Sequence, residues 1–189
     1  AHSALAQSAN DGFDPNAGST VRVAAVLSDG RIVLGGSFTN IAGTNRARIA
    51  RLMADGSVDA SFTNGANDSV YALAVESNNS VIVGGAFTML GGFPRQRLSR
   101  IRADGSVDNL FNPGVSNGAV NAVIVQPNGQ ILIGGSFTNV NGFERLHLCR
   151  LNTNGTLDMS FTPAADSNVY ALTIQPDDKI LVGGDFTNV

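Results

Sequence analysis

The sequence is poor in cysteine, in lysine and in long apolar runs. Cys149 is the only cysteine among the 189 residues, which excludes an intrachain disulfide and a thiolate metal cluster. Lys179 is the only lysine, and the arginines form no basic run, so we expect no nucleic-acid binding. No stretch of about 18 consecutive apolar residues occurs, so we expect no membrane-spanning segment.

Charge is also scarce. Charged residues make up 14% of the chain, and the formal net charge is −3, whereas about 25% is usual for globular proteins. Glycine, asparagine, serine and threonine are abundant instead. This composition favours strands and turns with polar surfaces, and it disfavours helices.

One short phrase, Gly-Gly-x-Phe-Thr, occurs four times along the chain. Its copies are Gly35–Thr39, Gly84–Thr88, Gly134–Thr138 and Gly183–Thr187. Successive copies are 49, 50 and 49 residues apart, a period typical of stacked structural repeats. Because one repeat cannot bury its own apolar face, the array is the predicted domain.

We predict a flexible lead-in over residues 1–12 and a repeat array over residues 13–189. The predicted units are 13–62, 62–111, 111–161 and an incomplete 161–189, and each begins at a phenylalanine. In the lead-in, Ala4-Leu5-Ala6 resembles the residues that precede a signal-peptidase cut. We therefore interpret the lead-in as a candidate signal-peptide remnant and expect a secreted or cell-surface protein.

Each complete unit contains four short segments with strand character. The first alternates, as in Val70–Val75; the second is apolar and runs into the repeated phrase; the third carries arginines, as in Arg97–Ile101; the fourth is short, as in Val107–Phe111. Asp-Gly, Asn-Gly and Asn-Asn turns join the segments as hairpins. The paired glycines are expected at a close backbone approach or a bulge, and the phenylalanine that follows them is expected to fill the space between sheets.

Four antiparallel strands in a unit of about 49 residues predict an all-β fold, a β-propeller with three complete blades and half of a fourth. The fourth unit ends at Val189 without its third and fourth segments. We expect either further repeats beyond this residue or a neighbouring chain that completes the blade.

The repeated phrase, the Arg-x-x-Arg-Leu segment and the Asp-Gly-Ser-x-Asp turn resemble the delta-60 repeat. This is a bacterial family of extracellular repeats, classed as a β-propeller domain of unknown function. The resemblance covers residues 13–189 and implies the propeller fold and a secreted bacterial source. It implies no settled activity and no cofactor.

Residues that recur in every repeat are most simply structural. Arg51 and Asp59, with their counterparts, are predicted to pair between strands. Calcium at Asp55–Asp59 is the alternative, although this loop lacks the length and the bidentate glutamate of an EF-hand. We predict no catalytic residue, no resident cofactor and no metal centre.

Residues that break the repeat are the candidates for a ligand or interface site. Asp185 replaces a serine or alanine of the other copies, and Tyr71 and Tyr170 stand where other repeats have Arg22 and Asn121. His147 replaces an arginine, and we expect it at an exposed strand position. The remaining repeat-breaking acids are Glu144, Glu76, Asp68 and Asp166. The selected candidates are Asp185, Glu144, His147, Tyr71 and Tyr170.

These observations leave three hypotheses open. The first is a non-enzymatic extracellular scaffold for protein binding, adhesion or assembly. The second is a carbohydrate-binding or glycoside-hydrolysing module that uses the repeat-breaking carboxylates and tyrosines. The third is a subunit of a homo-oligomer or filament, in which a neighbouring chain completes the open blade. The expected partner is accordingly a protein or a glycan.

Overall fold

The computed structural model describes residues 16–189. The predicted lead-in and Phe13 lie outside the described residues. Within residues 16–189 the ordered elements are strands and tight turns. No helix in this part of the chain is long and apolar enough to cross a membrane.

Three blades each contain a three-stranded antiparallel sheet, in which the second strand lies in the middle. Blade 1 consists of β1 (Val21–Val26), β2 (Ile32–Gly36) and β5 (Ile49–Leu52). Blade 2 consists of β6 (Val70–Val75), β7 (Val81–Gly85) and β10 (Leu98–Ile101). Blade 3 consists of β12 (Val120–Val125), β13 (Ile131–Gly135) and β16 (Leu148–Leu151). Blade 4 has β17 (Val169–Ile174) and β18 (Ile180–Gly184). The predicted propeller fold is confirmed.

The fourth segment of each complete blade is shorter than expected. It pairs with the third strand through a single bridge, such as Ile101 with Val107. A local turn ends the pairing, because the carboxylate of Asp59 accepts hydrogen bonds from both the backbone N–H and the hydroxyl of Ser61. This side-chain-to-backbone bonding competes with the sheet ladder.

The loop after the repeated phrase forms a small hairpin that the sequence did not lead us to predict. Its strands are two residues long: β3 (Asn40–Ile41) with β4 (Thr44–Asn45), β8 (Met89–Leu90) with β9 (Phe93–Pro94), and β14 (Asn139–Val140) with β15 (Phe143–Glu144). In blade 3, β11 (Val115–Ser116) adds a third strand beside β14. Gly43, Gly92 and Gly142 have positive φ in the turns of these hairpins.

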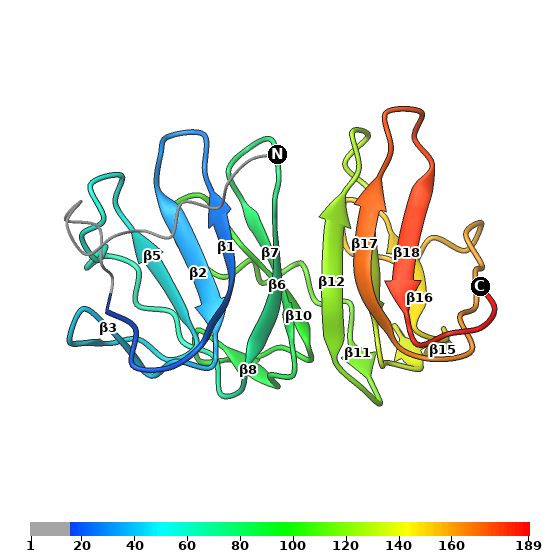
Figure 1. Ribbon diagram of the computed structural model, residues 1–189, viewed down its shortest axis with the longest axis horizontal. Coiled ribbons are helices and arrows are strands. Elements are labelled where there is room, and N and C mark those ends of the chain that lie inside the picture. The colour runs from blue at the N-terminus through cyan, green and yellow to red at the C-terminus, as the bar shows by residue number, and fades with distance from the viewer. Residues whose placement is uncertain (1–15) are drawn as a thin grey trace.

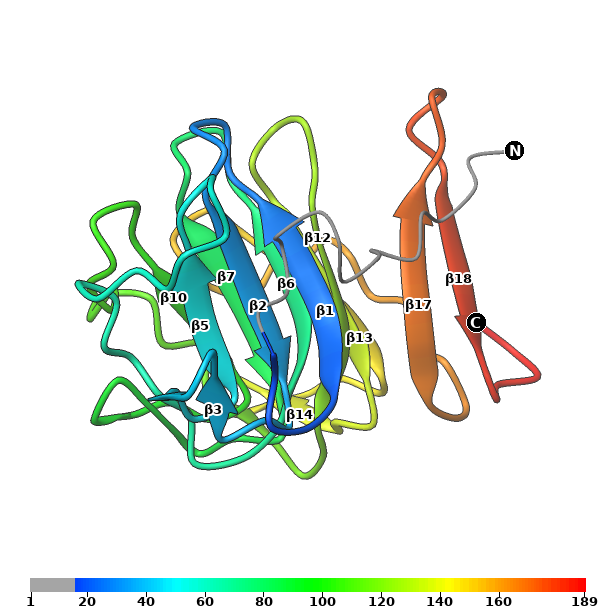
Figure 2. The same cartoon turned by 60° about the vertical axis from the view of Figure 1, so that its left-hand side comes forward.

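The blades stand side by side, and the first strands of successive blades contact one another (Figure 1). The turns between the first and second strands lie at one end of the blades, which we call the turn face. The small hairpins lie at the other end, the hairpin face. The β17–β18 pair stands at one end of the array (Figure 2).

The paired glycines have two different packing roles. A side chain on the first, such as Gly84, would collide with Val120 of the next blade, so this position sets the spacing between blades. A side chain on the second, such as Gly85, would collide with the carbonyl of Ser69 in its own blade. The predicted close approach is therefore found at both glycines, whereas the bulge lies in the first strand, which pairs with them.

The phenylalanines of the phrase are fully buried in the complete blades. Phe87 shares a core cluster with Leu27 and Ile49 of blade 1, as predicted for a residue that fills the space between sheets. Phe137 likewise shares a cluster with Ile82 of blade 2. The central strands β7 and β13 are buried along their whole length, as expected for inner strands.

Candidate functional site

Each first strand carries a one-residue bulge at its second position. In blade 2, Val70 pairs with Gly85 and Ala72 pairs with Gly84, so Tyr71 has no partner residue in the register. The same shift recurs in every blade and leaves Arg22, Tyr71, Asn121 and Tyr170 at the bulge positions. A bulge redirects its side chain out of the regular pleat.

The four bulge side chains line one hollow of about 440 Å³, which we call the bulge hollow. The Arg22 guanidinium lies 5.2 Å from the centroid of the Tyr71 ring, within the range of a cation–π contact. The Asn121 amide donates to the carbonyl of Val169 in the next blade at 3.1 Å. A position whose residue varies among the blades is thus gathered in one place.

In blades 1 and 4 the variable third residue of the phrase Gly-Gly-x-Phe-Thr lies beside the bulge residue of the same blade. In blade 4 the Tyr170 hydroxyl donates to the Asp185 carboxylate at 2.7 Å. In blade 1 the Arg22 Nε donates to the Ser37 hydroxyl at 3.3 Å. The hydrogen bond to Asp185 raises the pKa of Tyr170 above its ordinary value. The phenol therefore remains a donor at neutral pH.

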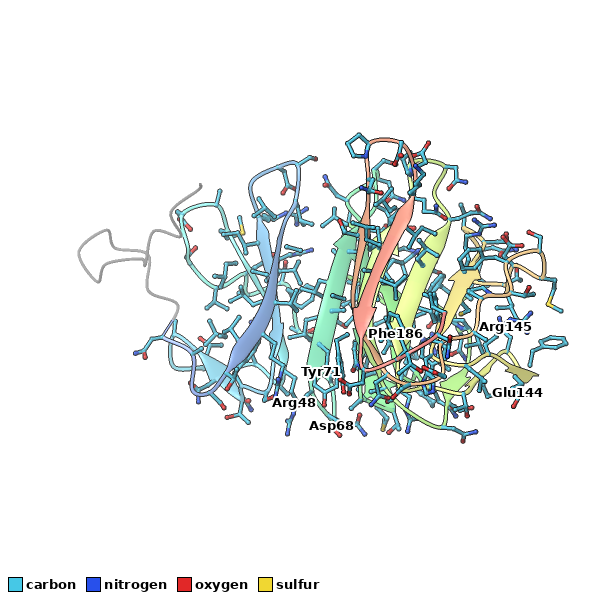
Figure 3. All side chains as sticks on the ribbon, turned by 45° about the vertical axis from the view of Figure 1, so that its right-hand side comes forward. Arg48, Asp68, Tyr71, Glu144, Arg145 and Phe186 are labelled. Carbon is cyan, nitrogen blue, oxygen red and sulfur yellow. The ribbon has the colours of Figure 1, made fainter. Side chains whose placement is uncertain are left out.

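Three of the five sequence candidates, Tyr71, Tyr170 and Asp185, are thus brought together at the bulge hollow. Glu144 is exposed on the hairpin face, and Figure 3 shows it beside Arg145 and well away from Tyr71. His147 precedes β16 in a left-handed conformation with φ 63°, and it is half-buried. Its counterparts Arg48 and Arg97 have the same backbone conformation.

His147 does not occupy the exposed strand position that the sequence suggested. Its backbone N–H donates to the carbonyl of Phe137, and its own carbonyl accepts from Gly135. These two bonds hold the residue outside the regular ladder. Its Nδ1 is buried without a hydrogen-bond partner among the described residues.

The recurring arginines and aspartates pair as the sequence predicted. Arg51 binds Asp59 at 2.7 Å, Arg150 binds Asp158 at 2.8 Å, and Arg100 approaches Asp108 at 3.5 Å. The guanidinium of Arg51 also donates to the carbonyl of Ala103 in the next blade at 3.1 Å, and Arg100 does the same to Thr153 at 2.6 Å. These residues join blades, and both Asp59 carboxylate oxygens already accept hydrogen bonds, which favours the structural role over calcium.

Cys149 packs in the core of blade 3. Burial raises the pKa of its thiol to about 12. A thiol with this pKa is not a nucleophile at neutral pH.

Sequence reasoning missed Arg22 and Asn121 as site residues, since they were noted only as replacements for the tyrosines. The available signal was register: all four residues are the second residue of the first strand, and each follows the residue that pairs with the second glycine of the phrase. A position that varies while its surroundings recur is the pattern that identifies them.

Together the fold and the blade-specific bulge residues define a β-propeller repeat protein with one variable concave surface. The chain belongs to the family described as "Domain of unknown function (DUF5122) beta-propeller", whose model matches residues 27–62, 76–111, 126–161 and 175–189. This agrees with the bacterial propeller-repeat family suggested by the sequence, although the delta-60 name stays a prediction. No curated protein matches the chain.

Solved propeller structures resemble the chain in fold. The WD40 β-propeller domain of Doa1 superimposes with a TM-score of 0.59 at 19% identity, over 87% of this chain and 48% of that one. A gluconolactonase from Xanthomonas campestris superimposes with a TM-score of 0.54 at 15% identity, over 92% of this chain and 57% of that one. The chain therefore spans about half the length of these structures. At such identities the likeness shows the fold alone.

Proposed function

We propose that this chain is a non-enzymatic binding scaffold, secreted or displayed at a cell surface, and that it holds a partner protein at the bulge hollow. The observation that carries the proposal is the collection of an arginine, an asparagine and two tyrosines, from four equivalent positions, around one hollow. The repeated residues fix the framework. The residues free to differ are the ones presented to a partner.

The chemistry of the hollow suits a loop of a protein. Tyrosine and arginine are the residue types that most often carry binding energy at protein interfaces. Arg22 is at the exposed end of the set and takes part in no salt bridge within residues 16–189. A loop that brings a carboxylate to Arg22 and backbone amides to Asn121 and Tyr71 would satisfy all three.

A displayed-peptide selection tests this proposal. Peptides are selected on the wild-type chain and re-tested on the Tyr71→Ala, Arg22→Ala double variant. Leu110→Ser is the control, because the Leu110 side chain is 88% exposed and lies outside the hollow. We expect enrichment of acidic peptides that bind the control normally and lose at least about tenfold in affinity on the double variant. Peptides that bind both variants equally would reject the proposal.

The proposed absence of enzymatic activity has its own test. The four lining residues of the hollow include no carboxylate, and Asp185 reaches it only through Tyr170, whereas glycoside hydrolysis uses two carboxyl groups about 5–9.5 Å apart. We expect no hydrolysis of glucono-lactone or of nitrophenyl glycosides above the rate in buffer. Turnover abolished by Asp185→Asn would establish the enzymatic alternative.

An oligomeric subunit is the second candidate function. Strand β18 pairs with β17 on one side, and within residues 16–189 no strand pairs with its other edge. An unpaired edge is a template for a strand from another chain. Light scattering across a concentration series decides this: a mass that stays at 19.5 kDa removes the candidate, and a concentration-dependent dimer supports it.

A further inference from the structure

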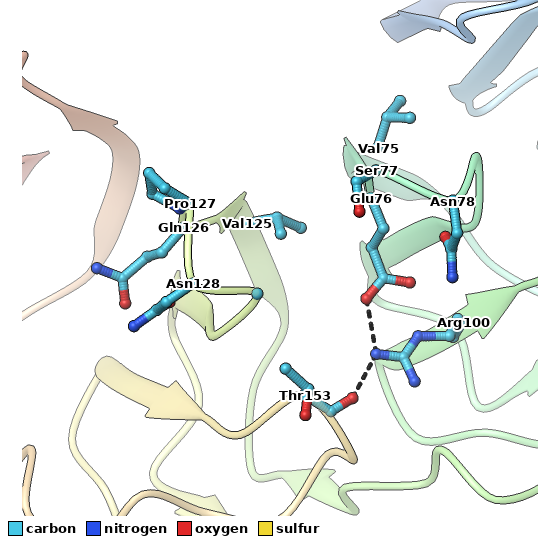
Figure 4. Close-up of a pocket in the computed structure, with 11 residues that line it drawn as sticks. Val75, Glu76, Ser77, Asn78, Arg100, Val125, Gln126, Pro127, Asn128 and Thr153 are labelled. Carbon is cyan, nitrogen blue, oxygen red and sulfur yellow. Dashed lines mark hydrogen bonds and ion pairs between the residues drawn. The ribbon is translucent and has the colours of Figure 1, made fainter.

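A second hollow lies at the turn face between blades 2 and 3, far along the blades from the bulge hollow. Its volume is about 600 Å³, within the range of small-molecule sites. Glu76 and Arg100 stand on one side of it, and Val125 and Thr153 stand on the other (Figure 4). We call it the seam cavity.

The seam between blades 1 and 2 provides an internal comparison, because the same positions are filled there by other residues. Leu27 replaces Glu76 and is buried in the core, and a hollow of only about 10 Å³ remains beside it. Asn79, the counterpart of Gly129, bonds across this seam to both the backbone N–H and the hydroxyl of Ser28, at 2.9 and 2.7 Å.

Two substitutions therefore open the second seam. Glu76 replaces an apolar side chain that fills the first seam. Gly129 has no side chain with which to bridge the turns. The rest of the frame is kept, including the arginine that donates to a carbonyl of the next blade. A seam that was merely poorly packed would not also carry a carboxylate.

The polar groups of the seam cavity are incompletely bonded. Glu76 Oε1 pairs with Arg100 at 2.7 Å, but Glu76 Oε2 and Arg100 Nε are buried without a hydrogen-bond partner among the described residues. In blades 1 and 3 the corresponding Nε atoms, of Arg51 and Arg150, bond to an aspartate. Glu76 thus shares the Arg100 guanidinium with Asp108, and one acceptor and one donor of the pair stay without a partner among the described residues.

The charges of the cavity favour a neutral ligand. Glu76 and Arg100 are its only charged lining residues, and they neutralise each other. The Glu76 carboxylate is an acceptor and the adjacent Arg100 guanidinium is a donor, which matches the paired hydroxyl groups of a sugar, since these both donate and accept hydrogen bonds. The side chains of Val75, Val125 and Pro127 add apolar surface for the C–H groups of a sugar ring.

We propose that the seam cavity binds a neutral saccharide unit, with Glu76 and Arg100 contacting adjacent hydroxyls. Binding turns the Glu76 carboxylate so that both of its oxygens are bonded. This site is separate from the protein-binding hollow of the proposed function. It also moves the carbohydrate hypothesis away from Asp185 and the tyrosines, on which the sequence had placed it.

Nuclear magnetic resonance of the labelled chain tests this proposal, with glucose, galactose, mannose and xylose as probes and inorganic phosphate as the charged comparison. We expect at least one sugar, at millimolar concentration, to shift the amide signals of Ser77, Asn78 and Gly129. Phosphate should leave them in place.

A closing variant copies the first seam into the second. It combines Glu76→Leu, Gly129→Asn and Thr153→Ala, since the first seam has Leu27, Asn79 and Ala103 at these positions. We expect a loss of at least about tenfold in sugar affinity, with thermal unfolding verifying the fold. Glu76→Gln is the milder second variant, and Leu110→Ser is the control that should bind like the wild type.

Three outcomes would overturn the proposal. The first is no shift at these amides with any of the sugars. The second is a shift that persists in the closing variant. The third is a shift confined to residues around Tyr71 and Tyr170, which would assign the sugar to the bulge hollow and contradict the protein-binding function as well.

Discussion

At Gly84 the backbone of blade 2 lies directly against the Val120 side chain of blade 3. A methyl group there would stand 2.7 Å from Val120 Cγ1, closer than real contacts allow. At Gly183, the same position in blade 4, the nearest contact would be Ala171 Cβ at 3.6 Å, an ordinary separation. The same position of the repeat is therefore tightly packed in blade 2 and has room for a methyl group in blade 4.

We expect Gly84→Ala to destabilise the chain by about 1–3 kcal/mol through overpacking. Gly183→Ala should be neutral, or should stabilise by about 0.4–1 kcal/mol through the unfolded state. Urea unfolding of both variants measures the difference. Equal effects at the two positions would show that close approach between blades is not the reason for the first glycine.

The carboxyl group of Asp158 makes the stability of the fold depend on pH. Hydrogen bonds from the Ser160 hydroxyl and backbone N–H, together with the Arg150 pair, lower its pKa to about 2, from about 3.9 in an unfolded chain. Because the folded pKa is the lower one, the ionised group stabilises the fold fully above about pH 4, and this contribution is lost as the pH falls toward about 2.

The Asp158→Asn variant should therefore unfold at a lower temperature than the wild type at neutral pH. The gap should narrow between about pH 4 and about pH 2, where the wild-type carboxyl becomes protonated. The asparagine oxygen can still accept from Ser160, but its NH2 group cannot accept from Arg150, so the variant removes the charge together with this ion pair. Melting temperatures of both proteins, measured across this pH range, test the prediction. A difference in melting temperature that stays constant would contradict the lowered pKa of Asp158.

For single residues, the sequence predicted which residues have a structural role or a candidate site role better than it predicted what those residues contact. The repeat identified Arg150 and Asp158 as a structural pair, and it singled out Tyr170 and Asp185 because they break the pattern. It could not show that Tyr170 donates a hydrogen bond to Asp185. The bulge that turns the tyrosine depends on the close approach of the Asn168 carbonyl to Gly184, which the sequence does not reveal. The sequence also could not show that Glu76 lines a cavity, because the opposite wall comes from the next blade.

At the scale of elements, the turns between first and second strands determine how tightly neighbouring blades close. The turn of blade 2 reaches that of blade 1 through Asn79 and Ser28, whereas Gly129 makes no such bridge from blade 3. Asn79 has φ 63°, which glycine also adopts freely. The bridge can therefore be removed without disturbing the turn.

We expect Asn79→Gly to destabilise the chain by about 1 kcal/mol, the usual net value of a lost hydrogen bond. Ser28→Ala should have a similar but smaller effect, because the bond from its backbone N–H remains. Ser77→Ala, at the corresponding place in blade 2, should be neutral. Thermal unfolding compares the three, and a neutral Asn79→Gly would mean that the bridge contributes nothing to the seam.

The elements also show where period-based prediction stopped working. Alternation and turn residues located the first and second strands, whose lengths of six and five residues are enough to show a pattern. The small hairpins escaped because strands of two residues have no period. The fourth segment was overestimated because its alternation continues past Asp59, where a side-chain turn ends the pairing.

In the whole molecule, the free energy of unfolding is approximately the sum of a term for each blade and a term for each interface between neighbouring blades. Strands β7 and β13 are each paired on both edges and covered by adjacent blades. Strand β18 is paired on one edge, and Leu181 within it is exposed. The array should therefore open from the β17–β18 end and not from its middle.

Hydrogen exchange tests this order directly. In dilute solution we expect the amides of β18 to exchange faster than those of β7 and β13, because half of them point to an edge without a partner among the described residues. If a second copy of the chain completes blade 4, protection of β18 should rise with protein concentration while that of β7 stays constant. Equal protection of all three strands in dilute solution would show that the array unfolds as one unit, and that the open edge does not weaken the last blade.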